Sequence, residues 1–250
     1  MKIADLLEGI TIDPTTNTLS FNYSDNNGTS TKLGKGKKFP VPYIKKDALL
    51  DGYAVYSVYA ASDAITTDVL MALKRKSNIS INPADYKHFI KRTAIFISAK
   101  ILAQNKIDVI ITPKASTDIL NDLLHELKER NSHIIFNPES IIKMVDFSKI
   151  IIDRTDPRIT PAIIVRLELI IKNAMKTGVF EVKKALPVYR KFFKNYFDVV
   201  DANLFSKLEG KNVCVIDDIM PSGTTQLQLM RIIADYAPEM VIGATMFKTA

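Results

Sequence analysis

The sequence predicts an α/β fold with a parallel sheet, and two strand–loop–helix units support this prediction. Residues 213–216 (Val-Cys-Val-Ile) are small or β-branched and apolar, as expected for a strand buried on both faces. A polar loop and an amphipathic helix follow, so the loop lies at the carboxyl end of the strand, where open α/β sheets bind ligands. Residues 107–112 form a second strand, a helix starts at Asp118, and residues 133–136 complete a right-handed βαβ unit with parallel strands.

Length and composition fit a folded globular protein and leave the ligand open. A chain of 250 residues allows one large domain or a domain with a sizeable appendage, and 47% hydrophobic with 24% charged residues is ordinary for such a protein. The net charge of +7 suits an anionic substrate, a nucleic acid or solubility alone. The first residues do not resemble a secretory signal and no run of about 18 apolar residues occurs, so we expect a cytoplasmic protein without a membrane partner.

The sequence indicates neither thiol chemistry nor a structural metal site. Cys214 is the single cysteine, which excludes an intramolecular disulfide, and its place in an apolar strand predicts a buried, inert thiol. His88, His125 and His133 are scattered, and neither CxxC nor HExxH is present. We therefore predict no structural metal.

The N-terminal region, residues 1–82, is expected to be a small α+β region separate from the core. Residues 19–23 alternate as a half-buried strand does, and Asn27-Gly28 is a good hairpin turn. Residues 32–38 are basic but lack the GxxxxGK[ST] spacing, so they indicate a solvated loop. Residues 53–59 resemble a strand, and residues 67–76 a short helix that ends in a basic cluster.

The core is expected over residues 83–250, with a helical insertion at about 138–205. A helix is predicted from Pro83 to about Gln104, and a clean apolar stripe predicts another that ends near Gly178. Residues 183–194 alternate aromatic and basic side chains, which suits a nucleic-acid surface but is more typical of an amphipathic helix with a lysine-rich outer face. Residues 240–247 are a final strand.

The stretch after the strand at 213–216 carries the strongest chemical signal. Asp217 and Asp218 end the strand with two carboxylates, which suit a sugar diol, a magnesium ion or a centre that becomes cationic. Ser222, Gly223 and Thr224-Thr225 then open a helix. Gly223 lacks the Cβ that would block close approach, so free N–H groups, hydroxyls and the helix dipole converge on one anion.

This arrangement of strand, acid pair, hydroxyl-glycine loop and helix resembles the phosphoribosyl-pyrophosphate (PRPP) signature of the type I phosphoribosyltransferases. The resemblance covers roughly residues 84–136 and 208–248. It implies a doubly wound parallel α/β core, a mobile catalytic loop within residues 137–161, and a hood over the base, here drawn from residues 1–82 or from the insertion. It also implies a pentosyl transfer of nucleotide metabolism, in which a nitrogen nucleophile displaces pyrophosphate from C1 of PRPP.

The resemblance assigns roles to individual residues. Asp217 and Asp218 would hold the ribose 2- and 3-hydroxyls and favour an oxocarbenium-like transition state. Mg²⁺ would be the cofactor, bridging ribose hydroxyls and pyrophosphate near these two residues without a direct protein ligand. The residues expected to bind the 5-phosphate are Ile219, Met220, Pro221, Ser222, Gly223, Thr224 and Thr225. Those of the expected pyrophosphate loop are Pro113, Lys114, Ala115, Ser116 and Thr117.

Two departures from the family pattern limit these assignments. The loop 113–117 contains no glycine, whereas many relatives have a Gly-rich loop there, so a plain capped βα turn is the alternative. Pro221 stands where relatives that act on 6-oxopurines often carry Asp, which favours a pyrimidine or an unusual base as acceptor. A homodimer is the expected assembly.

Two other functions remain open on the sequence. One is a PRPP-binding regulator that binds RNA or DNA, and the other is a transferase that acts on a base within nucleic acid. Both depend on the basic aromatic residues 183–194.

Overall fold

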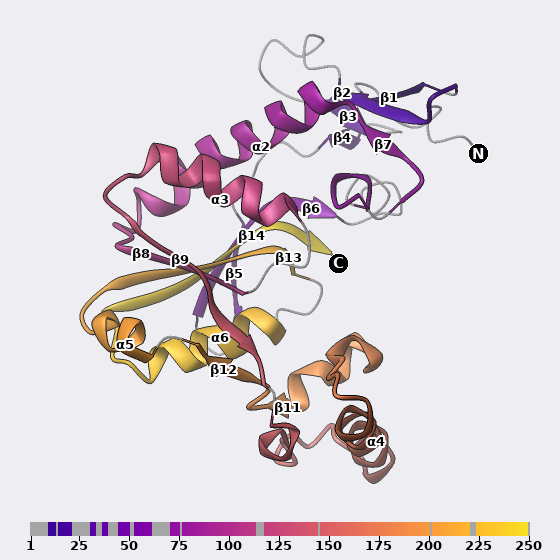
Figure 1. Cartoon of the computed structure of the whole chain (residues 1–250), viewed down its shortest axis with the longest axis vertical. Helices are drawn as coiled ribbons and strands as arrows, with labels where there is room; N and C mark the ends of the chain where they lie inside the picture. Colours follow the sequence, from indigo (N-terminus) through magenta and orange to yellow (C-terminus); the bar gives the residue numbers. More distant parts are fainter. Residues whose placement is uncertain are drawn as a thin grey trace.

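The computed structural model describes residues 10–13, 15–21, 31–33, 37–39, 45–50, 53–61, 71–75, 77–113, 118–144, 146–200, 202–220 and 224–249. Its centre is a seven-stranded sheet in the order β12-β9-β8-β13-β14-β6-β5 (Figure 1). These strands are β5 (Lys45–Leu50), β6 (Tyr53–Ala61), β8 (Val109–Pro113), β9 (Ile135–Lys143), β12 (Phe197–Val199), β13 (Asn212–Met220) and β14 (Met240–Thr249). The five inner strands are parallel, whereas β12 and β5 pair antiparallel at the two edges. The predicted parallel α/β fold is confirmed.

Helices cover both faces of the sheet, as a doubly wound fold requires. Helices α2 (Pro83–Ile97) and α3 (Asp118–Arg130) lie on one face, and α5 (Ala202–Phe205) and α6 (Thr224–Ala234) on the other (Figure 1). Alternate residues of β13 enter the two cores: Cys214 and Ile216 pack toward α2 and α3, whereas Val213 and Val215 pack toward α6. Because successive side chains of a strand point to opposite faces, this explains why the whole run is apolar.

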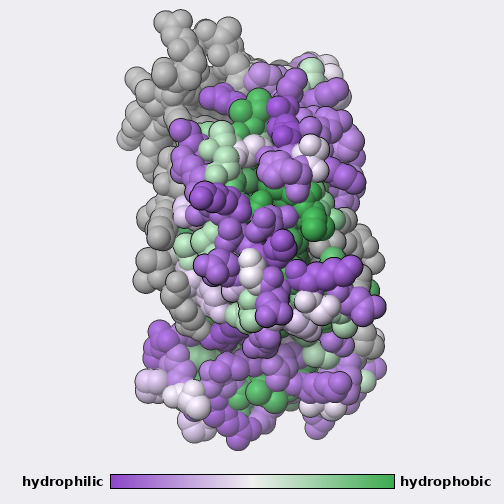
Figure 2. All heavy atoms as spheres, turned by 90° about the vertical axis from the view of Figure 1, so that its left-hand side faces the viewer, coloured by the Kyte–Doolittle hydropathy of each residue, from purple (hydrophilic) through white to green (hydrophobic). Residues whose placement is uncertain are grey.

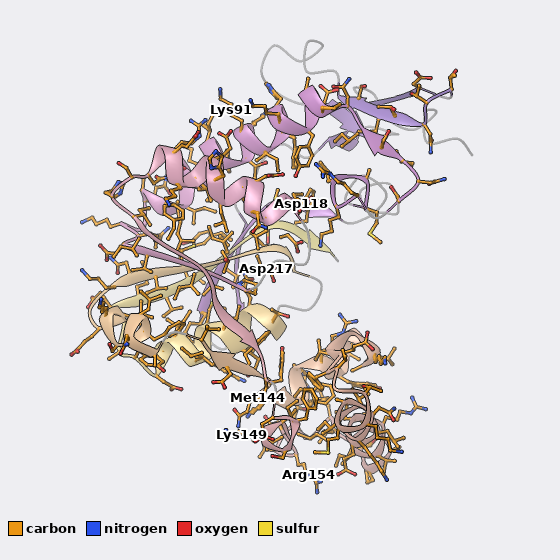
Figure 3. The ribbon with its side chains drawn as sticks, viewed as in Figure 1. Lys91, Asp118, Met144, Lys149, Arg154 and Asp217 are labelled. Carbon is orange, nitrogen blue, oxygen red and sulfur yellow. The ribbon has the colours of Figure 1, made fainter. Side chains whose placement is uncertain are left out.

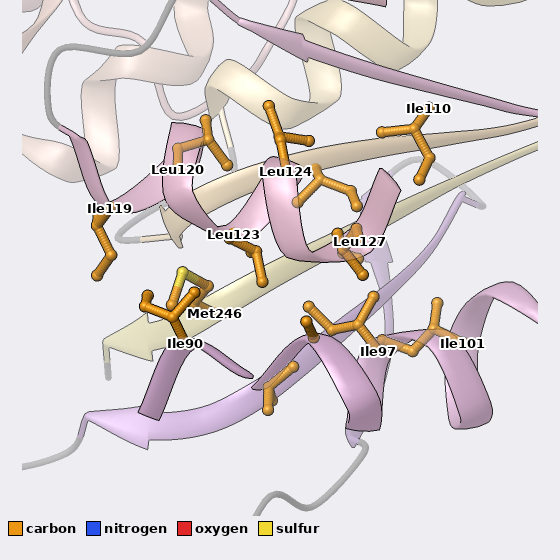
Figure 4. Close-up of a cluster of buried hydrophobic side chains, with 14 of the residues drawn as sticks. Ile90, Ile97, Ile101, Ile110, Ile119, Leu120, Leu123, Leu124, Leu127 and Met246 are labelled. Atoms are coloured by element: carbon orange, nitrogen blue, oxygen red, sulfur yellow. The ribbon is translucent and has the colours of Figure 1, made fainter. Parts of the chain in front are cut away.

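The core on the α2 and α3 side is built from the helical stripes that the sequence predicts (Figure 4). Helix α3 contributes Leu123 and Leu127, which are fully buried, and α2 contributes Ile90 and Ile97. Asn82 caps α2, because its Oδ1 accepts a hydrogen bond from Ala84 N at 2.9 Å. The expected helix to Gln104 continues past α2 as a π-helical turn, Ser98–Leu102.

The N-terminal region contributes two strands directly to the main sheet. Strand β6 pairs in parallel with β14, and β5 forms the adjoining edge. Strands β1 (Ile10–Asp13), β2 (Thr18–Phe21) and β7 (Ser80–Ile81) form a separate small sheet, and β3 (Thr31–Leu33) pairs with β4 (Lys37–Phe39). Residues 71–73 are helical, whereas Asn27 and Gly28 lie outside the described residues.

The insertion forms a compact unit beside the carboxyl ends of the parallel strands (Figure 1). It contains η4 (Phe147–Lys149), α4 (Pro161–Thr177), η5 (Val182–Lys184), η6 (Pro187–Phe192) and the pair β10 (Ile151–Ile152) and β11 (Phe193–Lys194). Thr160 and Pro161 start α4, and Gly178 ends it in a left-handed conformation with φ 69°.

One expectation for this unit is wrong. Residues 183–194 are two 3₁₀ helices and a short strand, not an amphipathic α-helix. Pro187 explains this difference, because proline within an α-helix removes a backbone donor and clashes with the preceding turn. Residues 137–143, at the start of the interval expected to contain a mobile catalytic loop, continue strand β9.

The amino ends of the parallel strands face the opposite side of the molecule. Hydrophilic residues predominate on that side, with hydrophobic residues gathered in smaller patches between them (Figure 2). Among the described residues, no helix combines the length and hydrophobicity that crossing a bilayer requires.

Candidate functional site

The acid pair lies where the sequence places it, at the carboxyl end of the central strand β13. This strand is flanked in parallel by β8 and β14. Asp218 is buried and Asp217 is partly exposed, and the Asp218 N–H donates a hydrogen bond of 2.8 Å to Asp217 Oδ1. Figure 3 shows Asp217 at this edge of the sheet, on the same side of the molecule as Asp118 at the start of α3. The two carboxylates therefore form one local cluster on a rigid element.

The environment of Asp217 favours its protonated form. Burial raises the pKa of Asp217 to about 7, and the negative charge of Asp218 contributes in the same direction. The hydrogen bond from the Asp218 backbone and the positive charge of Lys74 oppose this rise in pKa. Near neutral pH, the ligand-free acid pair therefore binds a proton for part of the time.

Lys74 is a member of this cluster that the sequence analysis did not connect to the site. Its Nζ lies 2.7 Å from Asp218 Oδ2, and only 11% of the lysine side chain and 12% of the aspartate side chain are exposed. The following residue, Arg75, places its Nη1 3.0 Å from Asp118 Oδ2. A basic cluster at the end of a short helix was predicted, but its approach to β13 depends on tertiary packing.

Helix α6 brings its amino terminus to the acid pair. The side chain of Gln226, which is buried, donates hydrogen bonds to Ala244 O at 2.7 Å and to Val215 O at 3.3 Å. These bonds attach the first turn of α6 to both β13 and β14. At Gly243, an added Cβ would lie 3.1 Å from the Gln226 side chain, so the glycine permits this close approach. Free N–H groups at the start of a helix bind anions.

The predicted 5-phosphate loop is only partly described. Pro221, Ser222 and Gly223 lie outside the described residues, as do the side chains of Ile219, Met220 and Thr224. The backbone of Ile219 and Met220 continues β13, and Thr224 starts α6. Thr225 is partly buried in the first turn. The loop thus begins beside Asp218 and ends at the amino terminus of α6.

Tyr196 is a second residue that the sequence analysis missed. It is buried and belongs to the segment that leads from the insertion back to the sheet. Burial raises the pKa of Tyr196, the neighbouring Thr225 side chain lowers it, and the negative charge of Asp217 raises it. Tyr196 therefore lies close to both the acid pair and the start of α6. No local sequence pattern signals this proximity.

The predicted pyrophosphate loop leaves the strand next to β13. Pro113 ends β8, and Asp118 begins α3. Lys114, Ala115, Ser116 and Thr117 lie outside the described residues. Since β8 and β13 are parallel neighbours, the loops that follow them start at the same edge of the sheet.

Two of the three aromatic rings in residues 183–194 are buried. Phe192 and Phe193 are 3% and 0% exposed and belong to the core of the insertion. Basic residues of the segment form ion pairs: Lys194 Nζ lies 2.7 Å from Asp153 Oδ2, and Lys184 pairs with Glu181. Base stacking requires an accessible ring face, so these two phenylalanines cannot provide it.

Other titratable groups offer no second centre in the described part of the chain. There, no group of three or more His, Cys, Asp or Glu side chains is placed to hold a metal ion. Cys214 is buried, and burial raises the pKa of its thiol, which keeps the thiol protonated and unreactive. Among the described residues, the acid pair is therefore the best candidate for a catalytic or binding site.

Comparisons with known proteins find similarity at the level of structure. No family model and no curated protein sequence matches the chain. A hypoxanthine phosphoribosyltransferase of Trypanosoma cruzi is 13% identical, with a TM-score of 0.36 over 65% of this chain and 66% of that chain. A lysine-to-arginine mutant of the T. cruzi enzyme, complexed with the product IMP, gives 13% identity and a TM-score of 0.37, over 66% and 64% of the two chains. A hypothetical protein from Neisseria gonorrhoeae with bound ppGpp is 15% identical, with a TM-score of 0.36 over 67% and 69%. The matched region thus spans about two thirds of each of these solved chains.

Proposed function

We propose that the protein is a phosphoribosyltransferase that transfers the 5-phosphoribosyl group of PRPP to a nitrogen nucleophile and releases pyrophosphate. The observation that carries this proposal is the acid pair Asp217-Asp218 on the central parallel strand, followed directly by the helix amino terminus at Thr224. The carboxylates can bind a sugar, and the helix amino terminus, which follows them after one loop, can bind the phosphate of that sugar. PRPP carries both kinds of group, a ribose diol and a 5-phosphate.

The two carboxylates would act on the ribose. Together they would accept hydrogen bonds from the 2- and 3-hydroxyls and, through their negative charge, favour the oxocarbenium-like transition state at C1. In the reaction, the bond from C1 to the pyrophosphate oxygen breaks while a bond from C1 to the acceptor nitrogen forms, and that nitrogen loses a proton. Because Asp217 has a pKa near neutrality, we expect the reaction to slow as the pH falls below 7.

The loops would bind the charged ends of the substrate. Residues 219–225 would bind the 5-phosphate, with Thr225 and the N–H groups at the start of α6 as donors. Residues 113–117, with Lys114, would bind the pyrophosphate. The residues present fit Mg²⁺ carried by the substrate, since two carboxylates at one strand end attract a hydrated cation that is bound to substrate phosphates. When bound, Mg²⁺ would neutralise charge on the leaving pyrophosphate, near Asp217 and Asp218 but through the substrate.

The acceptor would be a pyrimidine or an unusual base in preference to a 6-oxopurine. In the resembled family, enzymes that act on 6-oxopurines often carry a carboxylate at the position of Pro221, where it assists proton movement at the base. A proline cannot exchange a proton. The identity of this one residue is the basis for the preference.

The nucleic-acid alternatives receive less support. The regulator and the transferase that acts on a base within nucleic acid both require residues 183–194 to contact bases, whereas Phe192 and Phe193 are buried. If these residues nonetheless bind RNA or DNA, the affinity should fall steeply with salt, because phosphate contacts release counterions. Replacing Lys184 and Lys191 with Gln should then flatten that salt dependence.

Pyrophosphate release separates the enzyme from the regulator. The protein is incubated with PRPP, Mg²⁺ and single bases from a panel of pyrimidines, purines and other nitrogen heterocycles, and also with RNA and DNA oligonucleotides. We expect pyrophosphate to appear with a free base, and Asp217→Asn to lower the rate of its release by on the order of a hundredfold or more. Binding of PRPP without release of pyrophosphate for any acceptor would favour the regulator, and release only with an oligonucleotide would favour the third function.

A further inference from the structure

Lys74 brings a cation from outside the predicted core to the acid pair. Its side chain is largely buried, and its Nζ contacts Asp218 Oδ2 at 2.7 Å. Burying a lysine is costly unless a partner compensates its charge. Lys74 is therefore not a solvated surface lysine, and its charge acts on the acid pair.

We propose that Lys74 is a positioning residue for the reaction: its ion pair holds the Asp218 carboxylate in place at the sheet edge, so that the two carboxylates take different parts. Asp218, oriented by Lys74, accepts hydrogen bonds from the ribose diol. Asp217, which Lys74 does not contact, faces the positive charge that develops at C1. This inference rests on the proposed function.

The chemistry of carboxylates permits this division. An ionised carboxylate has two oxygens and accepts about four hydrogen bonds, so one bond to an ammonium group does not prevent binding of a diol. Without a nearby cation, two adjacent carboxylates in a partly buried site resist simultaneous ionisation. Lys74 supplies that cation and lowers the pKa of Asp217, in opposition to burial and to the charge of Asp218.

The backbone around Lys74 is shaped for this contact. Arg75 adopts a left-handed conformation with φ 54°, which is uncommon for a residue other than glycine, and its N–H donates to Ala72 O at 2.9 Å. Its guanidinium pairs with Asp118 and lies 5.7 Å from the centre of the Tyr86 ring. These contacts fix the turn, so that successive basic residues reach the strand end of β13 and the start of α3.

The segment 71–75 thus connects the two predicted PRPP loops. Asp218 precedes the expected 5-phosphate loop, and Asp118 follows the expected pyrophosphate loop. Leu73 is buried in the core on the α2 side, which anchors the segment. Lys74 is therefore held at the site by packing and by its neighbour's ion pair, as a positioning residue must be.

A cycle of variants tests the inference: Lys74→Met, Asp218→Asn, the double variant and Lys74→Arg. The control is Arg130→Met, which removes a partly buried ion pair with Glu126 at 3.2 Å on α3. Steady-state pyrophosphate release gives kcat and KM for PRPP from pH 5 to 9, and PRPP-induced thermal stabilisation gives a readout independent of turnover.

If Lys74 acts through Asp218, Lys74→Met lowers kcat/KM by on the order of tenfold to a hundredfold. It also moves the acid limb of the pH profile to higher pH, because loss of the cation raises the pKa of Asp217 further. The charged groups that act on Asp217 are Asp218 and Lys74, and the charge of Asp217 in turn raises the pKa of Tyr196. On the alkaline plateau of the pH profile, where Asp217 is ionised, Lys74→Met should add no further loss in the Asp218→Asn background. In the otherwise wild-type protein, Lys74→Arg should keep most of the activity that Lys74→Met loses, and the control should match the wild type.

Other outcomes are equally decisive. If the losses of kcat/KM from Lys74→Met and Asp218→Asn multiply in the double variant on the alkaline plateau, the inference is wrong. It is also wrong if Lys74→Met leaves the acid limb of the pH profile unchanged. Both outcomes leave the proposed function intact. If Lys74→Met does not fold, kcat/KM of Asp218→Asn is compared with that of the double variant instead. The double variant removes both charges of this ion pair, so it leaves neither group buried without the other. Equal values support the inference, and a further loss in the double variant contradicts it. A wild-type protein that neither binds PRPP nor releases pyrophosphate overturns the proposed function, and this inference with it.

Discussion

The charge of Asp217 should make the folded state less stable at neutral and alkaline pH, and this can be measured with Asp217→Asn. Burial, together with the charge of Asp218, raises the pKa of this carboxyl from 3.8 to about 7. A group whose pKa is raised on folding stabilises the protein fully below its unfolded pKa, and the stabilisation is lost as the pH rises through the folded pKa. Asn preserves the shape and carries no charge at any pH.

The size of the effect follows from the pKa difference. One pKa unit corresponds to about 1.4 kcal/mol, so the stabilising contribution of Asp217 should fall by roughly 2 to 3 kcal/mol between pH 5 and pH 8. Relative to the wild type, Asp217→Asn should therefore gain roughly that free energy of unfolding over the same interval. At pH 7.5 its melting temperature should equal or exceed that of the wild type.

Asp217→Asn should lower catalytic activity although it does not lower stability at neutral pH. The carboxylate is useful when a positive charge develops on the sugar, so its removal should lower kcat by on the order of a hundredfold or more. PRPP binding should weaken less than turnover, because the ground-state sugar is neutral at C1.

Chemical denaturation at pH 5, 6.5 and 8, together with pyrophosphate release at pH 8, checks both parts. The reasoning is refuted if the stability difference between Asp217→Asn and the wild type does not change with pH. Full activity of the variant with an acceptor that the wild type uses would show that Asp217 is structural.

Three further predictions concern its neighbours. Asp218→Asn should lower the free energy of unfolding by roughly 3 kcal/mol, because it leaves the buried ammonium of Lys74 without this charged partner, and urea unfolding at pH 7 measures it. Gly243→Ala should cost about 1 to 3 kcal/mol and weaken PRPP binding, since its Cβ would displace Gln226 from the first turn of α6; a stability equal to that of the wild type would contradict the packing described. Thr225→Val should weaken PRPP binding in calorimetry while the far-ultraviolet circular dichroism stays unchanged, and unaltered affinity would remove Thr225 from the phosphate site.

The local elements of the site could be predicted from the sequence because each is contiguous. The apolar run before Asp217 identifies a strand buried on both faces, and the glycine and hydroxyl residues after it mark a loop and a helix start. Asp118 and the leucine stripe that follows identify α3 in the same way. These signals need no knowledge of distant residues.

The remaining parts depend on pairing between distant segments. The alternation of β6 predicts a strand, but nothing in it indicates that its partner is β14. Lys74 resembles a solvated residue of a basic cluster until packing of Leu73 brings it to Asp218. The error at residues 183–194 had a local cause, since Pro187 already argued against a continuous helix.

Binding of PRPP at the amino terminus of α6 is the central claim, and calorimetric titration in the presence of Mg²⁺ tests it most directly. The wild type should bind PRPP with one site per chain, and the double variant Gly223→Val with Thr225→Val should show no binding while it remains folded. A ligand that binds only the folded state raises its stability, so thermal stabilisation by PRPP should disappear in the same variant. Undiminished binding by the folded double variant would place the phosphate site elsewhere and contradict the account.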